Sequence, residues 1–124
     1  EVKALNNAPG VFSARYAGKN ASSNDNVELL LKNLKGIKNR RARFITSICL
    51  IINSDITFFQ GTILGNITYQ KSGDNGFGYD PIFIPDSYDK TFAEMPFQFK
   101  NTISHRSIAI KKLVKYINKL IWRI

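Results

Sequence analysis

The chain has 124 residues, 44% of them hydrophobic, which suits one globular domain with a modest core. No apolar run approaches the roughly 20 residues of a membrane span, and residues 1–10 lack the layout of a signal peptide, so we expect neither membrane binding nor secretion. The single cysteine, Cys49, excludes an internal disulfide framework and favours a reducing, cytoplasmic compartment. The net charge of +9 would attract nucleic acid, but the basic residues are dispersed along the chain, which makes that partner the less favoured reading.

The first third of the chain predicts a loop and then a helix. Residues 5–18 begin with turn formers and continue into aromatic and small residues, as a structured loop does. Residues 22–25 offer several N-cap side chains for a helix over residues 26–38, and Gly36 provides a plausible end. Its apolar residues recur at helical spacing and predict one buried stripe, which comprises Val27, Leu30, Leu31, Leu34 and Ile37.

The middle of the chain predicts an antiparallel pair of strands. Residues 42–53 are almost continuously apolar and rich in β-branched side chains, which is typical of a strand covered on both faces. Cys49 lies within this run and is expected to be a small buried hydrophobic residue rather than a reactive thiol. Residues 56–69 resume the β composition after a short turn, with Gly61 and Gly65 expected at bulges or bends.

The last third predicts a short helix and a long one. Thr91 is followed three residues later by Glu94, which matches a capping box, and Pro96 should end the helix that forms there. A long helix from Ser104 to about Trp122 is expected to pack on the sheet. Its apolar stripe comprises Ile110, Leu113, Val114, Ile117, Leu120 and Ile121, with lysines on the other faces. An amphipathic helix at a membrane surface is the less favoured alternative.

The segment KNTISHR, residues 100–106, carries three basic side chains, Lys100, His105 and Arg106. His105 and Arg106 would lie in the first turn of the long helix, where a cation is unfavourable unless a ligand supplies negative charge or acceptor oxygens. This conflict indicates a bound anion or a molecule rich in acceptors. The alternative is a neutral His105 with a local partner and an Arg106 that reaches water.

The segment GFGYD, residues 76–80, has what a flat ligand needs. Phe77 or Tyr79 could stack on a base, while the neighbouring glycines expose backbone and Asp80 supplies a carboxylate. Stacking discriminates little between bases, so selectivity would come from polar groups such as Asp80, Lys100 and Arg106. The alternative is an ordinary loop in which Asp80 begins an Asp-Pro turn.

Four segments occur together in the order and spacing of a known family: APGVFSARYAG, GFGYDPIF, TFAEM and KNTISHR. In them the chain resembles the inosine triphosphate pyrophosphatase family, which hydrolyses ITP, dITP and XTP to the monophosphate and pyrophosphate. The resemblance extends from the first residues to about residue 115. It implies an α/β fold of the ITPase type, with a mixed twisted sheet flanked by helices. Residues 1–124 would form a single domain that corresponds to the C-terminal portion of the family's domain.

The resemblance also implies a substrate-binding set, which comprises Phe77, Gly78, Tyr79, Asp80, Lys100, His105 and Arg106. Phe77 would stack on the purine, and the three basic residues would contact the nucleotide, including its 6-oxo edge. That edge is an acceptor in hypoxanthine and xanthine but a donor in adenine. A buried donor left unpaired costs about 1–3 kcal/mol, so cationic donors would favour the deaminated bases. The family further implies Mg²⁺ as cofactor and a homodimer.

The phosphate loop, metal-binding glutamate and presumed base of the family lie in an N-terminal part that would precede Glu1. The sequence therefore looks truncated at its N-terminus, and no catalytic or metal-ligating residue is assigned to it. Our hypothesis is that the chain alone hydrolyses its substrate poorly or not at all. One alternative is a non-catalytic purine-nucleotide binder, split or degraded, and another is a small basic nucleic-acid-binding domain. Without the N-terminal part, a strand of the sheet would present an open edge that invites pairing with another chain.

Overall fold

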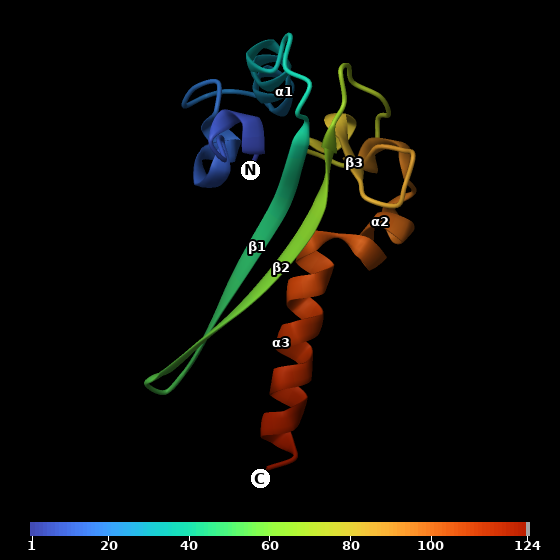
Figure 1. Cartoon of the computed structure of the whole chain (residues 1–124). Helices are drawn as coiled ribbons and strands as arrows, with labels where there is room; N and C mark the ends of the chain where they lie inside the picture. The colour runs from blue at the N-terminus through green and yellow to red at the C-terminus, as the bar shows by residue number, and fades with distance from the viewer. Residues whose placement is uncertain (124) are drawn as a thin grey trace.

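The computed structural model describes residues 1–123, which form a lobe and a long arm (Figure 1). The lobe contains helix α1 (Ser23–Asn33), the short strand β3 (Phe83–Pro85) and helix α2 (Phe97–Ile103). The arm is a hairpin of β1 (Arg41–Ile52) and β2 (Asp55–Ile67), with helix α3 (His105–Ile121) beside it. None of the helices in residues 1–123 has the length and apolar character that a membrane crossing requires.

The predicted antiparallel pair of strands is confirmed. β1 and β2 pair without interruption from Arg41 opposite Asn66 to Ile52 opposite Asp55, and β3 pairs with the other edge of β2. The strand order is β1-β2-β3, and both pairings are antiparallel. The expected α/β class is confirmed, although the parallel pairs that would make the sheet mixed are not among residues 1–123.

Gly61 and Gly65 do not form the bulges that the sequence predicted, because the strand register is continuous through both. A Cβ atom on Gly61 would overlap the carbonyl oxygen of His105 and stand 2.6 Å from the backbone nitrogen of Ala109. A Cβ on Gly65 would overlap the carbonyl oxygen of Ile84. Glycine is therefore required at these positions because α3 and β3 approach the backbone of β2 closely.

The hairpin is covered on one face only, so the prediction of a strand buried on both faces is wrong. On the covered face, Phe59 packs against Tyr116 of α3, with 5.3 Å between ring centroids. On the opposite face Phe58 is 71% exposed and Ile51 is 64% exposed. Cys49 lies on this second face and is exposed, so the prediction of a buried Cys49 is also wrong.

Helix α1 is confirmed, with its buried side and its cap. The Ser22 hydroxyl accepts the backbone N–H of Asp25 at 3.1 Å, and the Asp25 carboxylate accepts the N–H of Ser22 at 2.9 Å. The predicted stripe faces the core of the lobe, where Leu30 and Leu34 are fully buried. The helix ends at Asn33, before the expected residue 38. Residues 5–18 are more regular than the predicted loop, because they contain a 3₁₀ helix over Gly10–Arg15.

The segment that begins at Thr91 forms the predicted short helical turn and continues into a helix that was not predicted, α2. The capping box of Thr91 and Glu94 is confirmed over the 3₁₀ helix Phe92–Glu94. Pro96 does end that turn, but it also precedes α2, a helix that the sequence analysis missed. The apolar residues of this segment, Phe92, Ala93 and Met95, are buried in the lobe together with Thr91, whereas Glu94 is exposed.

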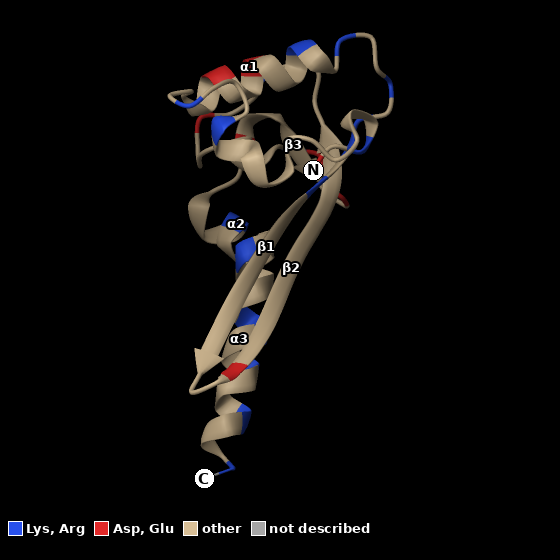
Figure 2. Cartoon of the chain, turned by 90° about the vertical axis from the view of Figure 1, so that its left-hand side faces the viewer, with Lys and Arg blue, Asp and Glu red and all other residues tan. Residues whose placement is uncertain are grey.

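Helix α3 starts where predicted, with the Ser104 hydroxyl accepting the N–H of Ser107 at 3.2 Å. The side that packs on the sheet includes only half of the predicted apolar stripe: Leu113, Ile117 and Leu120 are partly buried. Ala109 is buried against Gly61, whereas Ile110 and Val114 are 50% and 48% exposed. The helix packs on this side because two small residues, Gly61 and Ala109, allow the closest approach. Lysines lie along the rest of its surface (Figure 2).

Candidate functional site

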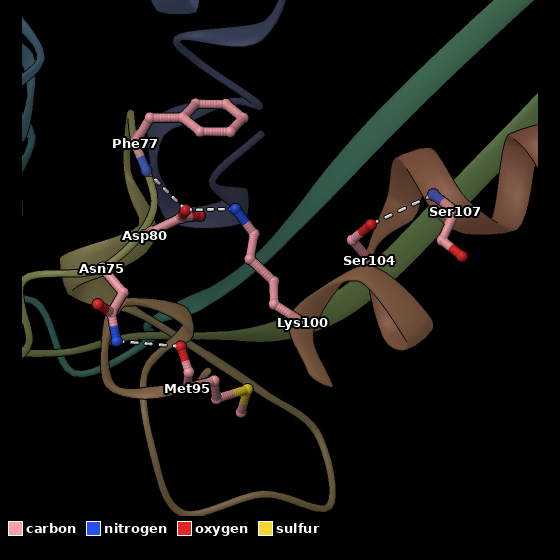
Figure 3. A network of polar contacts seen from close by, with 7 residues as sticks. All are labelled: Asn75, Phe77, Asp80, Met95, Lys100, Ser104 and Ser107. Carbon is pink, nitrogen blue, oxygen red and sulfur yellow. Dashed lines mark hydrogen bonds and ion pairs between the residues drawn. The ribbon is translucent and has the colours of Figure 1, made fainter. Parts of the chain in front are cut away.

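Residues 73–80 form a glycine-rich loop that hydrogen bonds attach to the segment containing the 3₁₀ helix Phe92–Glu94. The backbone N–H of Asn75 donates to the Ala93 carbonyl at 2.9 Å, and its side-chain amide donates to the Met95 carbonyl at 3.2 Å (Figure 3). Gly73 has a φ of +94°, and a Cβ there would lie 2.5 Å from the carbonyl oxygen of Ala93. The glycines thus let the loop follow the 3₁₀ helix closely and present Phe77 at the surface.

Asp80 is the centre of the site. Its Oδ2 atom accepts from Lys100 Nζ at 2.5 Å and from the backbone N–H of Phe77 at 2.9 Å (Figure 3). The side chains of Lys100 and Asp80 are only 8% and 6% exposed. A Cβ atom on Gly76 would overlap Oδ2, so glycine at this position makes room for the carboxylate under the loop. The buried ion pair joins the loop to α2.

Phe77 combines an open aromatic ring with two cations. Its side chain is 53% exposed, and the ring centroid lies 4.3 Å from Lys100 Nζ and 4.6 Å from Arg106 Cζ. Both distances are within the range of a cation–π interaction. Arg106 is exposed, and within residues 1–123 its guanidinium takes part in no hydrogen bond or ion pair. The site therefore offers a flat apolar surface beside unused donors.

His105 lies next to these residues in a neutral state. Its ring stacks on Phe44 of β1, with 4.8 Å between centroids and 12° between planes. Burial lowers the pKa of His105 to about 4, helped by the charges of Arg106 and Lys100. The alternative interpretation of KNTISHR expected a neutral His105, but also a local partner. Its Nδ1 atom is instead buried without a hydrogen-bond partner among the described residues.

Two residues of the predicted set, Gly78 and Tyr79, do not contact the basic residues of the site. The Tyr79 hydroxyl donates to the carbonyl of Ser13 at 2.7 Å, and burial raises the pKa of Tyr79 to about 12. It lines a cavity of about 490 Å³ that extends toward the N-terminal segment. Gly78 has a φ of +61° and open space around it. The structure thus brings together four of the predicted residues, Phe77, Asp80, Lys100 and Arg106, with His105 beside them. Tyr79 stabilises the loop through its hydrogen bond to Ser13.

Three supporting residues were missed from the sequence. Phe44 is the surface on which His105 stacks, and Asn75 and Thr91 fasten the loop, Thr91 through its hydroxyl to the Ser72 carbonyl at 2.6 Å. Only Thr91 gave a sequence signal, as part of the capping box. Phe44 and Asn75 contact residues that are far away in the sequence, His105 and Met95, and a local sequence pattern cannot indicate such contacts.

The residues present do not provide a metal site. No group of three or more His, Cys, Asp or Glu side chains in residues 1–123 is placed to hold an ion. Asp80, the carboxylate nearest the site's aromatic ring, is already paired with Lys100. The Mg²⁺ that the family resemblance implies is therefore not accounted for by these residues, and no catalytic step is derived through it.

Comparison with known proteins shows the family to which the chain belongs. A family model described as the Ham1 family matches residues 1–116. The dITP/XTP pyrophosphatase of Flavobacterium johnsoniae is 52% identical over 114 residues, which is 92% of this chain and 59% of that protein. That of Clostridium tetani is 49% identical over 121 residues, 97% of this chain and 60% of that protein. The chain therefore spans about three fifths of the length of the curated relatives it matches.

Solved structures agree with these relatives. The Ham1 protein of Staphylococcus aureus is 44% identical and superposes with a TM-score of 0.93, over 96% of this chain and 62% of that one. A HAM1 protein from Coxiella burnetii is 41% identical, with a TM-score of 0.91 over 95% of this chain and 62% of that one. The lobe and arm described above are thus an arrangement that these proteins share.

Replacing Asp80 by Asn should destabilise the protein strongly. The change leaves the Lys100 ammonium buried without a counter-charge, and removing one partner of a buried pair typically costs about 3–5 kcal/mol. The matched control is Asp86→Asn, which breaks the pair with Arg41, whose side chains are 42% and 47% exposed, and should change stability little. Urea unfolding of the three proteins measures the difference. Equal losses in the two variants would contradict the role given to Asp80.

The stability of the protein should fall as the pH drops from 6.5 toward 4. In this interval the unfolded state protonates its histidine, whereas folded His105 stays neutral until about pH 4. The unfolded state then binds more protons, so the free energy of unfolding rises with pH. His105 is the only histidine, and in His105→Gln the slope between pH 4.5 and 6.5 should be smaller. Urea unfolding at a series of pH values measures both slopes, and identical slopes would refute the assignment.

Proposed function

Because the chain belongs to the Ham1 family, we propose that its Phe77 loop and the basic residues beside it bind the base of a purine nucleotide. A Ham1 domain that contains this chain would hydrolyse ITP, dITP and XTP to the nucleoside monophosphate and pyrophosphate. The names of the relatives, dITP/XTP pyrophosphatases, support this substrate class. The homodimer that the resemblance implies is part of the same proposal, and the mass of the protein in solution would check it.

The observation that carries the proposal is the half-exposed Phe77 ring with Arg106 beside it. A base stacked on an aromatic side chain gains about 1–3 kcal/mol, almost independently of which base it is. Selectivity then depends on the rim of the base. Arg106 provides donors next to the ring, and Lys100 provides a second positive charge whose position is fixed by Asp80.

Cationic donors favour a base that carries a carbonyl oxygen at position 6. Inosine and xanthosine nucleotides present an acceptor there, whereas adenosine nucleotides present an amino group, which would leave the Arg106 donors unpaired. His105 lies beside these donors in its neutral form, so it adds no positive charge to the site. Guanine also carries the 6-oxo group, so its exclusion depends on contacts elsewhere around the base.

Catalysis requires groups that residues 1–123 do not bring together. Phosphoryl transfer depends on positioning the triphosphate and neutralising charge on the leaving pyrophosphate. We propose that Mg²⁺ and acidic ligands from the remainder of the Ham1 domain supply this. The chain by itself would then bind the nucleotide base but hydrolyse the triphosphate poorly, which keeps the non-catalytic binder as a second candidate.

Replacing Arg106 by Ala should weaken the binding of IMP by tenfold or more. A hydrogen bond that involves a charged group contributes about 1.5–3 kcal/mol, and each 1.4 kcal/mol is about tenfold in Kd. Arg15→Ala is the matched control, because Arg15 is also exposed and lies 4.9 Å from the ring centroid of Phe12, outside the site. Calorimetry with IMP compares the proteins. If both variants bind alike, Arg106 does not recognise the base edge.

The catalytic part of the proposal is tested by completing the domain. The chain is joined, in the order of the Flavobacterium johnsoniae relative, to the part of that protein which it does not match. Release of pyrophosphate from ITP, GTP and ATP with Mg²⁺ is then measured for the chain alone and for the joined protein. The joined protein should prefer ITP and the chain alone should be slow. A joined protein that is active without preference for ITP would disprove the substrate class, and an inactive one that still binds IMP would favour the non-catalytic binder.

A further inference from the structure

His105 is held by two strand residues that lie outside the predicted substrate-binding set. Its ring stacks on Phe44 of β1, with 4.8 Å between centroids and 12° between planes. Its backbone lies against β2, where a Cβ atom on Gly61 would overlap the carbonyl oxygen of His105. Phe44 and Gly61 belong to paired strands, with Gly61 opposite Thr46. The hairpin therefore determines both the position of the His105 backbone and the plane of its ring.

Phe44 is itself held in place by the core of the lobe. Its ring centroid lies 4.6 Å from that of Phe83 and 6.1 Å from that of Phe92. These two rings stack on one another at 5.6 Å, and both are fully buried. Side chains in a close-packed interior interdigitate with few voids, so a ring that contacts them has little freedom to turn. Phe44 therefore presents a surface of fixed orientation to His105.

The two ring nitrogens of His105 have different surroundings. Nδ1 is buried without a hydrogen-bond partner in the part of the chain that the structure describes. Within residues 1–123 Nε2 has no partner either, but it is open to solvent. A neutral imidazole carries one N–H donor and one acceptor nitrogen, and a buried N–H without an acceptor is rarer in native proteins than an unpaired acceptor. The proton therefore belongs on Nε2, where water or a ligand can accept its hydrogen bond.

The charges around His105 keep a second proton off the ring. Arg106 and Lys100 are the cations close to it, and both oppose an imidazolium. The carboxylate of Asp80 is already paired with Lys100. Burial acts in the same direction as the two cations, and together they lower the pKa of His105 to about 4. Near neutral pH, His105 is therefore a neutral donor beside two positively charged ones.

We propose that Phe44 is a positioning residue of the base site, which holds His105 so that its Nε2–H group donates to the bound base. The inference rests on the proposed function, because it takes the ligand beside Phe77 to be a purine nucleotide with an acceptor on its rim. A neutral donor of fixed orientation suits a carbonyl oxygen, since it forms a hydrogen bond without the desolvation cost of a further buried charge. Phe44 would act through His105 and not by contact with the ligand.

The state of His105 is measured first without nucleotide, by NMR of the protein labelled with ¹⁵N. His105 is the only histidine, so its ring nitrogens give the only imidazole signals. We expect the pattern of a neutral ring protonated at Nε2 around pH 7. In Phe44→Leu the ring loses its stacking surface and gains access to water. The midpoint of its titration should then rise from about 4 toward the ordinary value of about 6.5, and both neutral tautomers should be present.

Two further variants separate a specific effect of Phe44 from a general loosening of the protein. Phe44→Tyr retains the ring and should keep the His105 signals of the original protein. Phe59→Leu removes a ring of β2 that packs on Tyr116 of the same helix, at 5.3 Å between centroids, and should also leave these signals unchanged. An Nδ1–H tautomer in the original protein would overturn the proposal. Equal changes in Phe44→Leu and Phe59→Leu, or no change in either, would overturn it as well.

Calorimetry with IMP then tests the consequence for binding. Phe44→Leu should weaken the binding of IMP by roughly three- to tenfold, the range expected for the loss of one neutral hydrogen bond. The same substitution should have little effect in a protein that already carries His105→Ala, because both changes remove the same donor. Additive losses would show that Phe44 does not act through His105. A protein that does not bind IMP at all would refute the proposed function and with it the ligand of His105, whereas the NMR result by itself decides the role of Phe44.

Discussion

The buried ion pair between Asp80 and Lys100 is the interaction on which the candidate site depends. Burying a charged lysine or aspartate alone costs several kcal/mol of desolvation free energy, which an ion pair between the two can offset, so each side chain holds the other in place. The same carboxylate oxygen accepts the N–H of Phe77 and fills the space left free by Gly76. One pair thereby fixes the loop, the direction of Phe77 and the end of α2. This crowding explains Gly76, and closeness to the Ala93 backbone explains Gly73, whereas Gly78 has open space around it and a positive φ.

A second constraint brings the other basic residues to the loop. Gly61 and Ala109 let α3 lie directly on β2, so that the first turn of the helix reaches the lobe. His105 is then held against Phe44, and Arg106 stands beside Phe77. The unfavourable placement of the Arg106 cation in the first turn of α3 is thus maintained by tertiary packing. A ligand that supplies acceptor oxygens would relieve it.

The residues proposed to bind the base are gathered in one place in the molecule. They lie where the loop meets α2 and α3, and in the described part of the chain Arg106 and the Nδ1 atom of His105 have no polar partner. The groups that would hold phosphates and metal are not assembled in residues 1–123.

Local sequence was sufficient for α1, the hairpin and α3, and for most of the residues that the structure gathers at the candidate site, but it missed α2. Helical spacing identified α1 and α3, and an almost continuous apolar run rich in β-branched residues identified the hairpin. The motifs singled out Phe77, Asp80, Lys100, His105 and Arg106. Those signals are local because capping, side-chain periodicity and turn chemistry act over a few residues. The role of each site residue in substrate binding stays a proposal.

Tertiary structure alone decided which faces are covered and why the glycines stand where they do. The apolar run around Cys49 correctly indicates a strand with two apolar faces, but whether both are buried depends on what packs against them. Glycine is required at position 61 by a helix more than forty residues away in the chain, and the Tyr79 hydroxyl bonds to Ser13 in the 3₁₀ helix near the N-terminus. Such contacts form between segments that are distant in the sequence, and a local sequence pattern does not indicate which distant residue a side chain will contact.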